Sequence, residues 1–292
     1  MGFKIAVASG KGGTGKSTIS VNLFKTIRTA TKKTVQIIDC DVEEPNDKIF
    51  LKDITLAYQE PVEMLIPKIN PDTCTFCGKC VDVCSYNAIL MVKGISHIRV
   101  MDDLCHSCGA CTYFCPEDKV ITEHPKRLGD VNAFTFKGDD EPTFFEGRLD
   151  IGEALAVPVI KATKNKSTAD GITIIDAPPG TSCPAMEVVE DADYTVLVGE
   201  PTPFGMNDLK IMLETVQKMN RNVGVIINRA DVGTDELEKY LIEKNVDVLA
   251  KIPFDRHIAE TYSNGDLLVD KIPEIRELFI DVWNQINKNY LR

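Results

Sequence analysis

The sequence predicts an α/β fold with a doubly wound, mostly parallel sheet and a small inserted α+β unit that is rich in cysteine. Two observations predict the sheet: short, nearly continuous apolar runs recur along the chain, and amphipathic helical patterns separate them. A third predicts the insertion, because this alternation stops near residue 61 and resumes near residue 124. We expect one discontinuous domain over residues 1–60 and 124–292 and a second domain over residues 61–123.

The predicted strands are β-branched runs of the kind that is buried on both faces of a parallel sheet. They are FKIAVA at 3–8, TVQIID at 34–39, GITIID at 171–176, YTVLVGE at 194–200, VGVIIN at 223–228 and DVLAKIP at 247–253. Helical spacing of apolar residues follows in residues 17–30, 208–220, 234–245 and 274–289. Residues 133–154 predict two short strands or a hairpin that leads into a helix.

Composition excludes several classes of function. Apolar residues make up 43% of the chain and no run approaches the ~18 apolar residues of a membrane span. The net charge of -11 argues against a nucleic-acid partner, and the mixed charge of the last helical segment argues against membrane targeting. Because the first predicted strand begins at Phe3, the chain has no room for a targeting signal, so we expect a cytoplasmic protein.

Residues 10–17, GKGGTGKS, satisfy the pattern G-x-x-x-x-G-K-[ST] between a predicted strand and a predicted helix. In such a loop backbone amides surround phosphate oxygens, the lysine reaches the β- and γ-phosphates, and the final hydroxyl binds Mg²⁺. The alternative, a glycine-rich turn that binds nothing, does not explain the strand–loop–helix setting. The residues expected to contact nucleotide are Gly10, Lys11, Gly12, Gly13, Thr14, Gly15, Lys16, Ser17 and Thr18.

The longer string GKGGTGKST resembles the deviant phosphate loop of the MinD, ParA, Mrp and nitrogenase iron protein superfamily of P-loop NTPases, because it carries a second lysine, Lys11. The resemblance implies an ATPase that forms a nucleotide-sandwich homodimer, in which Lys11 reaches the partner's nucleotide. Positive charge placed there would stabilise the transition state. The alternative is a solvated lysine on a loop.

The same resemblance implies roles for carboxylates that end two predicted strands. Asp41 would orient the attacking water, Asp39 would lie near the metal shell, and Asp176 would hold Mg²⁺ through water, beside Ser17. Gly180, in APPG, would present its amide to the γ-phosphate. Lys11, Lys16 and Asp41 are then the catalytic residues, although carboxylates at strand ends also serve as plain caps.

Recognition of the base is predicted from IINRAD, residues 226–231. The resemblance places Asn228, Arg229 and Asp231 at the base, and adenine is the base that the superfamily normally binds. The order N-R-x-D also resembles the guanine-reading N-K-x-D, so the choice of ATP over GTP rests on the resemblance alone.

Eight of the ten cysteines form two copies of the spacing C-x2-C-x2-C-x3-C. Each copy fits the bacterial ferredoxin pattern, in which the fourth cysteine binds the other cluster. Zinc and disulfides are alternatives, but zinc usually takes two cysteine pairs per ion. One [4Fe-4S] cluster would be bound by Cys74, Cys77, Cys80 and Cys115, and a second by Cys84, Cys105, Cys108 and Cys111.

The remaining cysteines and histidines have simpler interpretations. Cys40 is expected as a small buried strand residue, and Cys183 as a structural thiol, with a dimer-bridging cluster as its alternative. His97, His106 and His124 are expected to be surface or packing residues.

Two functions stay open at this point. The first is an ATPase whose dimer and switch changes gate electron transfer from two [4Fe-4S] clusters to a partner metalloprotein. The second is an ATP-dependent scaffold or carrier for metallocluster assembly, whose own clusters are structural or sensing. The chain lacks the C-terminal C-x-x-C of Mrp-type carriers, and its acidity favours a partner with a basic patch.

Overall fold

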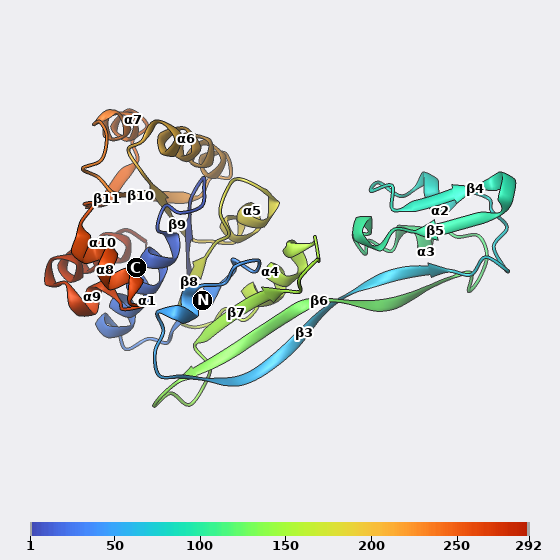
Figure 1. The fold of residues 1–292 in the computed structure, drawn as a ribbon, viewed down its shortest axis with the longest axis horizontal. Coiled ribbons are helices and arrows are strands. Elements are labelled where there is room, and N and C mark those ends of the chain that lie inside the picture. Colours follow the sequence, from blue (N-terminus) through green and yellow to red (C-terminus); the bar gives the residue numbers. More distant parts are fainter. Residues whose placement is uncertain (1, 291–292) are drawn as a thin grey trace.

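The computed structural model describes residues 2–290, apart from the side chain of Tyr290. The described residues form a nine-stranded sheet in the order β11-β10-β9-β1-β8-β2-β7-β6-β3 and a separate two-stranded sheet, β4-β5. All six predicted strand runs are confirmed, and they form the parallel centre of the large sheet (Figure 1). These strands are β1 (Phe3–Ala8), β2 (Val35–Asp39), β8 (Ile172–Asp176), β9 (Tyr194–Gly199), β10 (Asn222–Asn228) and β11 (Asp247–Ile252).

Helices cover both faces of this parallel centre, which explains why its strands are buried on both sides. On one face an apolar cluster joins the sheet to α1 (Lys16–Ala30), α9 (Leu268–Lys271) and α10 (Pro273–Tyr290). On the other face a second cluster joins it to α4 (Ala156–Lys164), α5 (Cys183–Glu190), α6 (Pro203–Lys218) and α7 (Glu236–Glu243). The four predicted helices correspond to α1, α6, α7 and α10. A further helix, α8 (Arg256–Ser263), precedes α9.

The sheet continues into a long antiparallel ribbon. Strands β3 (Ile54–Ile69) and β6 (Ile121–Phe136) each contain 16 residues and pair from Ile54 opposite Phe136 to Ile69 opposite Ile121. The predicted hairpin is also present, since the last part of β6 pairs with β7 (Phe144–Leu149) and α4 follows. The ribbon passes through residues 61 and 123, so the strand pairing crosses both positions at which we expected the domains to divide.

Residues 70–120 lie at the far end of this ribbon from the phosphate-binding loop (Figure 1). They contain two four-residue helices, α2 (Lys79–Asp82) and α3 (Ala110–Tyr113), and the hairpin of β4 (Ile89–Val92) with β5 (His97–Val100). Short 3-10 turns are η1 (Asp47–Ile49), η2 (Lys93–Ile95) and η3 (Asp102–Leu104). Within residues 2–290, no helix has the length and apolar character needed to cross a bilayer.

Candidate functional site

The glycine-rich loop joins the carboxyl end of β1 to the start of α1, and its glycines are required by its shape. Gly13 and Gly15 have φ angles of 74° and 100°, in the left-handed region that favours glycine. A Cβ atom on Gly15 would lie 2.6 Å from Asn228 Nδ2, and one on Gly10 would lie 2.3 Å from the Asp208 carbonyl oxygen. The loop is therefore packed tightly against both α6 and the end of β10.

The first turn of α1 is tied to the end of β8. Ser17 Oγ donates a hydrogen bond to Asp176 Oδ2 at 2.6 Å, and Ser20 Oγ donates to Asp176 Oδ1 at 2.9 Å. Lys16 is 7% exposed. Thr14 is also buried, and its Oγ1 has no hydrogen-bond partner among the described residues. A buried hydroxyl without a partner fits a loop that receives a polar ligand.

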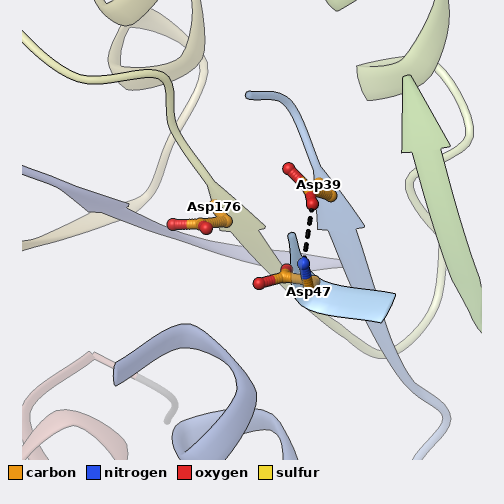
Figure 2. A group of neighbouring side chains, drawn as sticks. All are labelled: Asp39, Asp47 and Asp176. Atoms are coloured by element: carbon orange, nitrogen blue, oxygen red, sulfur yellow. Dashed lines mark hydrogen bonds between the residues drawn. The ribbon is translucent and has the colours of Figure 1, made fainter. Parts of the chain in front are cut away.

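Three aspartates meet beside this turn (Figure 2). Asp39 ends β2, Asp176 ends β8 and Asp47 begins η1; their side chains are buried, and one carboxylate oxygen of each lies within 4.8 Å of the others. Asp39 accepts hydrogen bonds from the backbone N–H groups of Asp41, Asn46 and Asp47 at 2.9–3.0 Å. Oxygen-only donors of this kind suit a hard cation such as Mg²⁺.

The electrostatics of the aspartates follow from burial. Burial and the neighbouring Asp176 carboxylate raise the pKa of Asp39 and of Asp47 well above the usual range. Burial also raises the pKa of Asp176, although hydrogen bonds from Ser17 oppose the rise. For Asp41, burial raises the pKa to about 6 against the opposing charge of Lys16. The site therefore attracts a positive charge, either a proton or a cation.

Lys11 and Gly180 make internal contacts in this conformation. Lys11 Nζ lies 3.1 Å from Glu200 Oε2, and Glu200 Oε1 lies 2.9 Å from Arg229 Nη1. The Gly180 N–H donates to the Ser9 carbonyl at 3.0 Å. The Lys11 ammonium group and the Gly180 N–H, which the resemblance assigns to phosphate contacts, therefore both contact groups of their own chain in this conformation.

A cavity of about 300 Å³ opens beside the loop, between Gly15, Thr18, Asn228, Phe254 and Tyr262. Asn228 Nδ2 donates to the Thr14 carbonyl at 2.8 Å.

Asp231 Oδ1 accepts from the Phe254 N–H at 2.6 Å. The predicted base residues therefore shape this cavity through hydrogen bonds within the protein. No local motif indicated the two aromatic walls of the cavity, which come from the segment after β11.

The eight clustered cysteines line two separate cavities in residues 70–120. Gly78 and Gly109, with φ angles of 92° and 71°, turn the chain into α2 and α3 next to these cavities. Cys74, Cys77, Cys80 and Cys115 line one cavity, and Cys84, Cys105, Cys108 and Cys111 line the other. In each cavity three cysteines come from one copy of the motif and the fourth comes from the other copy.

Backbone donors face several of these sulfurs. The N–H groups of Phe76 and Ala88 lie 3.4 Å from Cys74 Sγ and 3.3 Å from Cys84 Sγ. Such donors stabilise negative charge on sulfur, and in iron–sulfur proteins they tune the cluster. Burial raises the pKa of Cys80 to about 11, so without a neighbouring positive charge this thiol is protonated at neutral pH.

The structure agrees only in part with the expectations for the remaining cysteines and histidines. Cys40 is buried, whereas Cys183 is exposed at the start of α5. His106 stacks on Tyr86 with ring centroids 3.7 Å apart, beside the second cavity. His97 and His124 lie in β5 and β6.

Residues 5–269 match the family of the CobQ/CobB/MinD/ParA nucleotide binding domain. An uncharacterized protein of Methanocaldococcus jannaschii is 31% identical, with 97% of each chain covered. An iron-sulfur cluster carrier protein of Pyrococcus furiosus is 28% identical, covering 90% of this chain and 78% of its own. The septum site-determining protein MinD of Pyrococcus horikoshii, complexed with Mg-ADP, has a similar fold, with a TM-score of 0.56, 21% identity and coverage of 99% and 97%.

The fold, the glycine-rich loop at the end of β1 and the match over most of the chain agree with one another. The chain belongs to the CobQ/CobB/MinD/ParA nucleotide-binding family.

Proposed function

We propose that the protein binds and hydrolyses ATP and couples nucleotide-driven changes of a homodimer to electron transfer from two [4Fe-4S] clusters to a partner metalloprotein. One observation carries this proposal. The same chain that has the phosphate-binding loop also has eight cysteines sorted into two cavities with four cysteines each.

The nucleotide part of the proposal rests on the loop and its partners. Lys16 would contact the β- and γ-phosphates, Ser17 would bind Mg²⁺, and Asp39 and Asp176 would hold the ion through water. The hydrogen bond from Ser17 to Asp176 keeps these groups together. MinD from Pyrococcus horikoshii, a protein of similar fold, has been solved as a complex with Mg-ADP, and this supports the assignment.

The cluster part rests on the donor sets of the two cavities. Four cysteine side chains in one cavity would suit a [4Fe-4S] cluster, since four thiolates would supply one ligand for each of its four irons. Such a cluster supplies one-electron redox chemistry. The residues that would bind the first cluster are Cys74, Cys77, Cys80 and Cys115, and those for the second are Cys84, Cys105, Cys108 and Cys111. The inserted segment is then a ferredoxin-like domain.

The proposal of a homodimer rests on Lys11. In the dimer, Lys11 would leave Glu200 and contact the nucleotide of the partner subunit, while Asp41 orients the attacking water. The Lys11 side chain is 32% exposed, so a second subunit could reach it.

A second candidate is an ATP-dependent scaffold or carrier for metallocluster assembly. The name of the Pyrococcus furiosus relative, an iron-sulfur cluster carrier protein, favours it. In this case the clusters of residues 70–120 would be structural or would sense the state of the cell.

One experiment separates the two candidates. The protein is prepared without oxygen, its clusters are reduced, and their oxidation by a co-purifying metalloprotein is followed with ATP, without ATP and in Lys16→Ala. We expect oxidation to depend on ATP and on Lys16. Equal rates in all three conditions would contradict gated electron transfer. Maturation of the partner by a variant without clusters would instead favour assembly.

A further inference from the structure

Asp47 has no part in the roles assigned above. It begins η1, on the segment that leads from β2 into the ribbon. Its side chain is fully buried, and neither carboxylate oxygen has a hydrogen-bond partner among the described residues. A buried carboxylate without a hydrogen-bond donor destabilises the folded state, so this side chain needs a proton or a cation.

The two neighbouring aspartates differ from Asp47 in this respect. Asp39 accepts three backbone hydrogen bonds, and Asp176 accepts one from Ser17 and one from Ser20. The carboxylates of Asp39 and Asp176 are therefore fixed in place, whereas the Asp47 carboxylate faces that of Asp176, with which it can pair only through a shared proton or a cation. Figure 2 shows the three carboxylates gathered at the ends of β2 and β8.

We propose that Asp39, Asp47 and Asp176 form a divalent-cation site that holds its ion before any nucleotide binds. One oxygen of each lies within 4.8 Å of the others. An ion with bonds of about 2.1–2.4 Å can bind oxygens that are up to roughly 4.2–4.8 Å apart, so three oxygens within this separation are close enough to share one Mg²⁺, Mn²⁺ or Ca²⁺.

Because the site has a third carboxylate, it does not need nucleotide phosphates to bind its ion. A magnesium site with one or two carboxylates usually needs substrate phosphates to complete it. Three carboxylates provide a charge of about −3, which holds a divalent ion with one negative charge left over, and Lys16 is close enough to Asp176 to offset it. The inference goes beyond the proposed function, because it concerns the chain without ATP and does not depend on electron transfer.

The test is a titration of Mn²⁺ into the nucleotide-free full chain, with free Mn²⁺ measured by electron paramagnetic resonance. Asp47→Asn keeps the volume of the side chain and removes its charge. Glu44→Gln makes the same change of charge at an exposed position of the same loop. We expect the wild type and Glu44→Gln to bind one Mn²⁺ each, and Asp47→Asn to bind it at least about tenfold more weakly.

Thermal unfolding gives a second readout that requires no hydrolysis. Without metal, Asp47→Asn should unfold at a higher temperature than the wild type, because it removes an unpartnered buried charge. Mn²⁺ should raise the unfolding temperature of the wild type and leave that of the variant nearly unchanged.

The inference is overturned if the wild type takes up no Mn²⁺ at millimolar concentration. It is equally overturned if all three proteins bind Mn²⁺ alike, which would place the ion at the surface or among the cysteines. If Asp47→Asn does not fold, Asp47→Ala replaces it. Loss of Mn²⁺ binding in Asp47→Ala then supports the site, and unchanged binding overturns the inference.

Discussion

At the scale of single residues, Glu200 controls where Lys11 lies. Its side chain is 4% exposed and is neutralised by Lys11 and Arg229. If Lys11 acts on the nucleotide of a second subunit, this ion pair competes with dimer formation. The Lys11 side chain is 32% exposed, so solvent screens its end of the pair, and we take the pair to be worth on the order of 1 kcal/mol, which sets the size of the competition.

We predict that Glu200→Gln strengthens the ATP-dependent dimer. The amide keeps the shape of the side chain but releases Lys11, so half-dimerisation should occur at a roughly two- to tenfold lower protein concentration. The measurement is molar mass by light scattering with ATP, in an Asp41→Ala background that slows hydrolysis. Glu190→Gln, an exposed glutamate at the end of α5, is the control. A weaker or unchanged dimer in Glu200→Gln would remove the proposed competition.

Asp41 should make the stability of the metal-free protein depend on pH. Burial raises its pKa from 3.8 to about 6, so between these values the folded state holds more protons than the unfolded state. The free energy of unfolding must then fall as pH rises from about 4 to about 6. The half-exposed position of Asp41 limits this contribution to the order of 1 kcal/mol.

The measurement is urea unfolding in EDTA at several pH values for the wild type and Asp41→Asn. Asp39, Asp47 and Asp176 have shifts of the same direction, so both proteins should lose stability with rising pH. The wild type should lose more between pH 4 and 6. Glu43→Gln, exposed on the same loop, should follow the wild type. Parallel curves for the wild type and Asp41→Asn would show that Asp41 titrates normally.

At the scale of elements, the two cysteine motifs exchange one residue each. Cys115 follows α3 but lines the cavity beside α2, and Cys84 lines the cavity beside α3. Each cluster would therefore hold both copies of the motif together. Double substitutions can distinguish this crossed arrangement from an uncrossed one, in which the four cysteines of each motif would bind the same cluster.

We predict that Cys77→Ser with Cys115→Ser damages one cluster, whereas Cys108→Ser with Cys115→Ser damages both. The first double variant should retain about four iron atoms per chain and the second close to none, because each [4Fe-4S] cluster needs four ligands. Iron and acid-labile sulfide are measured after anaerobic reconstitution. An uncrossed arrangement would give the opposite result. Cys183→Ser, outside both cavities as the structure describes them, should keep about eight iron atoms.

The elements of the parallel sheet could be predicted because burial on both faces leaves a continuous apolar run. The ribbon could not, since β3 reads ITLAYQEPVEMLIPKI, with two prolines and mostly exposed side chains. Proline normally argues against a strand, but β3 is the edge of the sheet, where a missing N–H is tolerated. Local sequence therefore did not reveal that the two flanks of the cysteine segment pair with each other.

The residues of the nucleotide and metal site could also be predicted only in part from local sequence. Ser17, Asp39 and Asp176 follow from motifs at strand ends, and the structure brings them together. Ser20 and Asp47 belong to no such motif. Ser20 meets Asp176 across 156 positions of sequence, and Asp47 turns back onto β2 through η1. Contacts of this kind depend on the folded topology and not on local spacing.

At the scale of the whole molecule, the ribbon separates the cysteine cavities from the nucleotide loop. Strands of 16 residues each, joined by 15 residue pairs, extend for roughly 50 Å at about 3.3 Å per residue. Electrons would therefore leave the clusters directly toward a partner and not by way of the nucleotide site. Any coupling between the two would run through the ribbon or through a partner that contacts both.

The ribbon also makes the cysteine segment removable, because Asn70 and Val120 close it. The Asn70 N–H donates to the Val120 carbonyl at 2.9 Å, as at the end of a hairpin. We predict that replacing residues 71–119 with Asn-Gly, a sequence suited to a two-residue hairpin turn, gives a folded protein without iron. It should hydrolyse ATP within about threefold of the full-chain rate, because the sheet and the loop keep their own core.

The shortened protein should unfold at a somewhat lower temperature, since Ile66 belongs to an apolar cluster that also contains Ala88 from the removed segment. Hydrolysis is measured as phosphate release, and the same truncation with Lys16→Ala supplies the background. A folded truncation that has lost hydrolysis would show that the nucleotide site needs the cysteine segment.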